Sequence, residues 1–89
     1  MADTDIAQRG LARVVARFPH AAEALRGLVL TDPAFREICE EYALAERSLA
    51  GFEARLDAAE RPEIGEYRAV IAELETEIDR MLKEAGPTR

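Results

Sequence analysis

Four glutamates stand in pairs at a spacing that could hold a metal ion. Glu37 and Glu41 are four residues apart, as are Glu73 and Glu77, so each pair would lie on one face of a helix. Carboxylate metal sites in helical bundles normally also use histidines and point into the core. All four glutamates lie outside the apolar positions of the helices described below. This favours a solvated acidic face, and we predict no metal site.

His20 and Cys39 are the other candidates for chemistry. His20 is the only histidine, so the chain alone cannot build a two-histidine metal site or a catalytic triad. Its position after Pro19 is typical of the exposed first turn of a helix. Cys39 is followed by two glutamates, which raise rather than lower the pKa of a thiol, so a partly buried structural cysteine is favoured over a reactive one. The sequence predicts no enzyme activity, no cofactor and no small-molecule substrate.

A row of arginines precedes the first proline. Arg9, Arg13 and Arg17 recur every four residues, so a helix here would carry them as one basic stripe. Apolar side chains occupy the opposite face: Leu11, Val14, Val15 and Phe18. A basic amphipathic helix can bind an acidic protein, a membrane surface or nucleic acid, or it can pack on the chain's own acidic body.

Both arrangements of this arm, residues 1–17, are consistent with the pattern. If the arm packs on its own body, its arginines lie near carboxylates such as Glu73 or Glu77. If it binds a partner, its arginines point away from the body; we favour this arrangement because the other helices account for their own apolar positions. The candidate partner-binding residues are then Arg9, Leu11, Arg13, Val14, Arg17 and Phe18, joined by two apolar residues outside the helical seams, Leu44 and Val70.

Two longer segments must form the body that positions these residues. Apolar residues in both recur at alternating spacings of three and four, the pattern of a coiled-coil seam. The first helix is expected over residues 33–60, because Asp32 can cap it and Pro33 can be its first residue. The second is expected over residues 63–85, stopped by Gly86 and Pro87. The two seams are Phe35, Ile38, Tyr42, Ala45, Leu49, Phe52, Leu56 and Ala59, and then Ile64, Tyr67, Ile71, Leu74, Ile78, Met81 and Ala85.

The break at Arg61 and Pro62 predicts an antiparallel hairpin with a defined register. Folding the chain there brings the two seams together in layers, in which each alanine meets a larger side chain. Beside the seam, Glu53 would face Arg68, whereas Glu46 would face Glu75 unfavourably. The expected layers are Ala59/Ile64, Leu56/Tyr67, Phe52/Ile71, Leu49/Leu74, Ala45/Ile78, Tyr42/Met81 and Ile38/Ala85.

A short amphipathic segment, residues 20–30, precedes the hairpin. Such a helix is marginal alone and needs a surface to dock on. Its apolar face consists of Ala21, Leu25, Leu28 and Val29. We expect it to fold back as a lid over the open end of the hairpin, near Phe35, Cys39 and Leu82. The predicted fold is therefore all-α: an antiparallel helical hairpin domain over residues 18–89, with a short N-terminal lid helix and the amphipathic arm.

Several of these residues resemble a known family. Phe18-Pro19, Pro33-x-Phe35, then Ile38, Tyr42 and Leu49 at seam spacing, and a second helix ending "EIDRML" are similar to the bacterial YdcH-like family. That family consists of small cytosolic helical hairpins without an assigned activity. The resemblance covers roughly residues 18–85. It implies a cytosolic hairpin and supplies no catalytic residues.

The charge distribution bears on the class of partner. The net charge is −6: residues 1–30 carry four arginines against three acids, and the remaining two thirds of the chain are acidic. An acidic body argues against nucleic acid as the main partner. No segment approaches the ~18 apolar residues that span a bilayer, and we expect a cytoplasmic protein. The main hypothesis is a protein-interaction module that self-associates or docks on a larger protein. The alternative is a protein that binds nucleic acid or a membrane surface through Arg9, Arg13 and Arg17.

Overall fold

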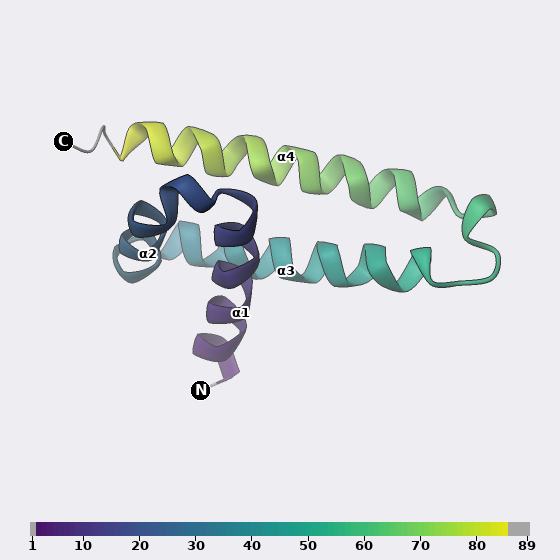
Figure 1. Cartoon of the computed structure of the whole chain (residues 1–89). Coiled ribbons are helices and arrows are strands. Elements are labelled where there is room, and N and C mark those ends of the chain that lie inside the picture. The colour runs from purple at the N-terminus through teal and green to yellow at the C-terminus, as the bar shows by residue number, and fades with distance from the viewer. Residues whose placement is uncertain (1, 86–89) are drawn as a thin grey trace.

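The computed structural model of the chain describes residues 2–85, with side chains from residue 8 onward, as an all-α fold. The elements are α1 (Ala2–Arg17), a 3-10 turn (Pro19–Ala21), α2 (Ala22–Thr31), α3 (Pro33–Glu53), a second 3-10 turn (Ala58–Glu60) and α4 (Pro62–Glu84). The long helices α3 and α4 run antiparallel, and α1 and α2 pack near the open end of this hairpin (Figure 1). The predicted hairpin with shorter N-terminal helices is confirmed.

The start of α3 follows the local signals. The Asp32 side chain accepts hydrogen bonds from the backbone N–H groups of Ala34 at 3.0 Å and Phe35 at 3.4 Å. These donors would otherwise lack an intrahelical acceptor, and Pro33, which has no N–H, is the first residue of the helix. Phe35 is then completely buried one turn into α3. The cap therefore fixes where α3 begins and places Phe35 one turn into it.

The base of the hairpin is buried at positions where the predicted layers require it. Ala45 and Ile78, expected in one layer, are both buried, and so are Tyr42 and Met81. Nearer the turn, the Arg68 guanidinium lies 2.8 Å from a carboxylate oxygen of Glu53, the one favourable charge pair that the register predicted.

The tip of the hairpin differs from the prediction. α3 ends at Glu53, and residues 54–61 form the connection, so the expected helix to residue 60 is wrong. Leu56 is fully exposed (109%) and Ala59 is exposed, which removes the two outermost layers. Tyr67 instead stacks on Phe52, with ring centroids 5.8 Å apart.

Local interactions account for this early helix end. Asp57 accepts hydrogen bonds from Arg55 at 3.0 Å and Arg61 at 3.1 Å, which stabilises the turn. Arg61 is extended, as a residue before proline prefers. The alanines near the turn bury little apolar surface, so continuing the helix would gain little free energy.

α2 covers the open end of the hairpin, as the lid prediction required. Leu25 is completely buried in the same cluster as Phe35 and Cys39. Ala21, Leu28 and Val29 pack half-buried against that cluster, and so does Leu82 of α4. The Arg36 side chain donates a hydrogen bond of 2.9 Å to the carbonyl of Val29, one of the last acceptors of α2. The lid spans Ala22–Thr31 rather than residues 20–30, because Pro19 starts a 3-10 turn ahead of it.

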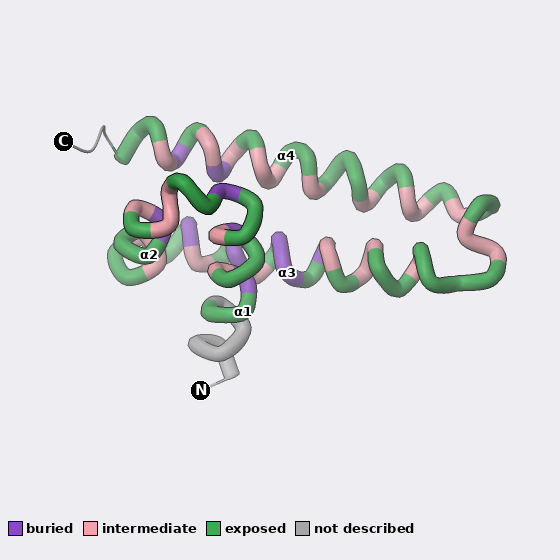
Figure 2. The backbone as a smooth tube through the Cα atoms, viewed as in Figure 1, coloured by how far each residue is buried: buried purple, intermediate pink, exposed green. Residues whose placement is uncertain are grey.

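α1 also contributes to this core. Val14 is completely buried and Phe18 nearly so, both in the cluster that contains Ile78. Buried positions accordingly gather where α1 and α2 meet the hairpin, while its far end is only half-buried or exposed (Figure 2). The predicted stop at Gly86 and Pro87 lies outside the described residues.

Candidate interaction surface

The close approach of α1 to α3 depends on Gly10. A Cβ atom built at this position would lie 2.1 Å from the carbonyl oxygen of Cys39, far inside any allowed contact. Gly10 is buried, and only glycine lets the two backbones come this close. In the sequence, Gly10 counts only as a weak helix former. Its role in packing can be recognised only when the position of α3 is known.

Two of the three arginines in the basic stripe bind the chain's own hairpin. Arg13 lies 3.0 Å from Glu46 of α3, and Arg17 lies 3.1 Å from Glu75 of α4. Glu75 also accepts a 2.8 Å hydrogen bond from the Tyr42 hydroxyl, so this carboxylate joins α1, α3 and α4. Burial, together with the hydrogen bond to Glu75 and the nearby carboxylates, raises the pKa of Tyr42 above its usual value.

These ion pairs change two expectations from the sequence. Glu46 and Glu75, expected to repel each other across the hairpin, each receive an arginine from α1. The structure thus shows the arm packed on its own body, with Glu46 and Glu75 as partners in place of Glu73 or Glu77. The favoured arrangement, in which all three arginines point away from the hairpin, is wrong for Arg13 and Arg17.

The apolar residues of the arm face the chain's own core. Val14 and Phe18 are buried and Leu11 is half-buried, so their surfaces are already used within the fold. The Arg17 guanidinium also lies 5.1 Å from the centre of the Phe18 ring, a cation–π contact that holds the end of α1. The prediction that Val14 and Phe18 bind a partner is therefore wrong, since both are core residues.

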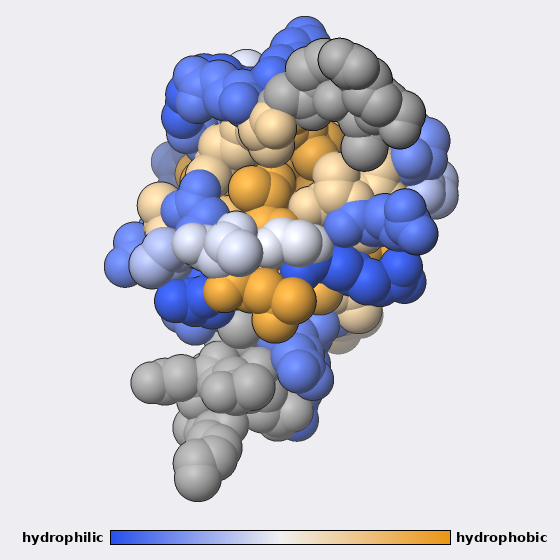
Figure 3. Space-filling model, turned by 90° about the vertical axis from the view of Figure 1, so that its left-hand side faces the viewer, coloured by the Kyte–Doolittle hydropathy of each residue, from blue (hydrophilic) through white to orange (hydrophobic). Residues whose placement is uncertain are grey.

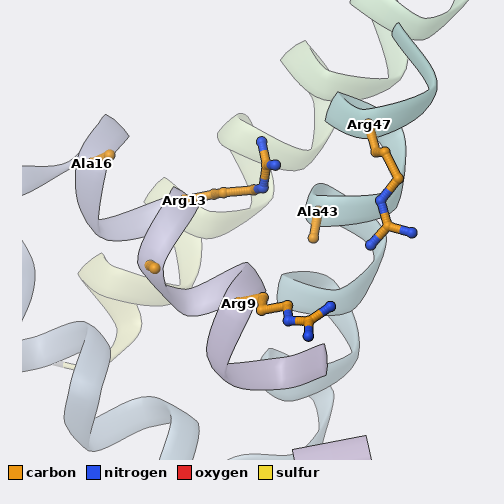
Figure 4. A pocket seen from close by; sticks show the side chains of 6 residues that line it. Arg9, Arg13, Ala16, Ala43 and Arg47 are labelled. Atoms are coloured by element: carbon orange, nitrogen blue, oxygen red, sulfur yellow. The ribbon is translucent and has the colours of Figure 1, made fainter. Parts of the chain in front are cut away.

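A groove remains between α1 and the outer side of α3. It has a volume of about 460 Å³, and its rim is basic while its floor is alanine; the lining residues are Arg9, Ala12, Arg13, Ala16, Ala43 and Arg47. In Figure 4 the arginine side chains of both helices project along this groove. A second hollow, of about 320 Å³, adjoins it on α3 and is lined by Glu40, Glu41, Ala43, Leu44 and Arg47. Ala43 and Arg47 belong to both.

Large apolar side chains are exposed on several elements. Leu44 is 60% exposed on α3, and Val70 is 43% exposed on α4. Both were predicted from the sequence to lie outside the apolar seams. Leu30, 79% exposed on α2, was not foreseen. Leu30 lies just outside the apolar face of α2, and this position is the only feature of the sequence that could have indicated its exposure. Seen end-on, the open end of the hairpin shows apolar surface surrounded by hydrophilic side chains (Figure 3).

The residues that the sequence singled out for chemistry, Cys39, His20 and the paired glutamates, show no arrangement that would serve as a chemical site in the described part of the chain. Cys39 is completely buried, and burial together with Glu40 raises the pKa of its thiol to about 12. His20 is exposed at the first 3-10 turn, with its ring against the edge of Phe18. Within residues 8–85, no three His, Cys, Asp or Glu side chains come together as metal ligands. Glu77 instead pairs with Arg80.

No family model, curated protein or solved structure matches this chain. The resemblance to the YdcH-like family therefore stays a prediction. In the described part of the chain, no helix is both long enough and apolar enough to cross a membrane.

Proposed function

We propose that this protein is a non-enzymatic interaction module, which self-associates or docks as a small accessory subunit on a larger protein. The observation that carries the proposal is the exposure of Leu44 and Leu30, 60% and 79%, on the outer faces of regular helices. Neither leucine belongs to the buried cluster that α1, α2 and the hairpin form, or to the partly buried residues packed against it. Such leucines gain free energy only when another molecule covers them.

The alternative, binding to nucleic acid or a membrane surface through the basic stripe, has less support. Arg13 and Arg17 are ion-paired with Glu46 and Glu75, so part of their charge is neutralised within the fold. The body of the protein is acidic and would repel a polyanion. An apolar contact surface fits the exposed leucines better.

Affinity capture from the native cell tests the proposal. The bait is the full chain, compared with a variant in which Leu30, Leu44 and Val70 are all replaced by Gln. Because these side chains are exposed, the variant should keep its fold, which circular dichroism checks. We expect the wild type to retain itself or a specific protein in high salt, and the variant to lose it.

Salt separates the two classes of partner. Binding through exposed arginines weakens steeply between about 50 and 200 mM salt, whereas apolar contacts hardly change. Capture of nucleic acid or lipid that disappears at high salt and survives in the Gln variant would contradict the interaction-module proposal.

A further inference from the structure

The charged and apolar side chains on the outer face of α3 are arranged so that two copies of this face could complement each other. Leu44 is at its centre, and Glu40 precedes it by one turn while Arg47 follows it by nearly one turn. Glu40 and Arg47 are seven residues apart, two turns of an α-helix, so they lie on the same side of Leu44. Glu41 and Ser48 are also seven apart and lie on its other side.

The charged side chains on this face are not paired within the described chain. Among the described residues, the side chains of Glu40, Glu41 and Arg47 form no hydrogen bond or ion pair, although they line the hollow beside Leu44. Seven residues beyond Leu44, a Cβ atom at Gly51 would meet nothing within 4 Å, so this part of α3 is open to close approach. α1 and α4 use other sides of α3, since α1 packs on Cys39 and Glu75 of α4 binds the hydroxyl of Tyr42.

We propose that two copies of this chain associate by packing the outer faces of their α3 helices antiparallel, around a two-fold axis at Leu44. This inference rests on the proposed interaction function and names the partner. In an antiparallel pair related by a two-fold axis, each side of one helix meets the same side of the other. Arg47 of one copy then meets Glu40 of the second copy, and the same pair forms again in reverse.

The other contacts in this arrangement are also compatible. Ser48 of one copy faces Glu41 of the second and can donate a hydrogen bond to it. Leu44 of each copy enters the hollow of about 320 Å³ beside Leu44 of the other. On the Arg47 side, the Arg47 guanidinium meets the acidic half of the second α3 helix, so charge complementarity supports a second copy as the occupant.

Charge reversal gives a specific test, with sedimentation equilibrium of the purified full chain as the readout. We expect the wild type to dimerise, and Leu44→Gln to weaken dimerisation at least about ten-fold while the monomer keeps its helical circular dichroism spectrum. Glu40→Arg places two arginines opposite each other, and Arg47→Glu places two glutamates opposite each other. Each of these variants should therefore also dissociate.

Mixing the two charge variants distinguishes this contact from other surfaces. Glu40→Arg mixed with Arg47→Glu should form a one-to-one heterodimer, because both charge pairs become favourable again, and a chain carrying both changes should dimerise as the wild type does. Leu56→Gln, at a fully exposed position in the connection between α3 and α4, is the control and should leave dimerisation unchanged.

Three outcomes would overturn the inference. One is a wild type that stays monomeric at high micromolar concentration, and another is dimerisation unaffected by Leu44→Gln. The third is two charge variants that stay monomeric when mixed. If the chain is monomeric but captures a different protein through its exposed leucines, this inference fails while the proposed function stands.

Discussion

At the scale of single residues, Gly10 decides whether α1 can dock. A Cβ atom there would meet the Cys39 carbonyl at 2.1 Å, so we expect Gly10→Ala to push α1 away from α3. The expected loss is about 1–3 kcal/mol of unfolding free energy, measured by denaturant titration. Gly27→Ala is the matched control: its Cβ would meet nothing within 4 Å, and it should stabilise α2 by about 0.5–1 kcal/mol. A Gly10→Ala variant as stable as the wild type would contradict the docking of α1.

Cys39 makes the fold sensitive to alkali. Burial and the neighbouring Glu40 raise the pKa of its thiol from 9.0 to about 12, so the folded state holds this proton more tightly than the unfolded state does. The resulting stability is fully present below pH 9 and is lost progressively as the pH rises to about 12. Tyr42 has a raised pKa as well and acts in the same direction. Denaturant titrations of the wild type between pH 8 and 11 should show this loss, and Cys39→Ala should show a smaller one.

At the scale of elements, packing rather than charge should hold α1 in place. Val14 is completely buried, whereas the Arg13–Glu46 ion pair is half exposed to solvent. We expect Val14→Ala to cost about 1–3 kcal/mol, and Arg13→Ala to cost no more than about 1 kcal/mol. Thermal unfolding measures both, since each kcal/mol shifts the midpoint of a domain this small by about 4–8 °C. Equal losses for the two variants would show that α1 is held by its ion pairs.

At the scale of the whole molecule, stability should fall from the base of the hairpin to its tip. The extents of 48 × 28 × 19 Å describe an elongated body, with its buried residues gathered at the end that α1 and α2 cover. Ile64 and Tyr67 are only half-buried, in contrast to Ile78. Amide hydrogen exchange should therefore be fastest around residues 54–68 and slowest around Tyr42 and Ile78. Uniform protection along α4 would contradict this gradient.

The local features of this fold could be predicted from the sequence. The Asp32 cap, the proline start of α3, the break at Pro62 and the period of the seams depend on residues a few positions apart, so they can be recognised without the fold. The antiparallel hairpin, the burial at its base and the Glu53–Arg68 pair also follow from the sequence, because the two seams meet when the chain folds back at Arg61 and Pro62. The predicted end of α3 was wrong at Leu56, since an apolar residue at the right period does not show whether a partner is there to cover it.

The tertiary structure alone decided what the N-terminal arm does. The sequence allowed Arg13 and Arg17 to face either a partner or the chain's own body. Their acceptors, Glu46 and Glu75, are 33 and 58 residues away along the chain. A basic stripe fits any acidic surface within reach. The choice therefore depended on the close approach at Gly10 and the burial of Val14, which exist only once α3 and α4 have formed the surface on which α1 packs.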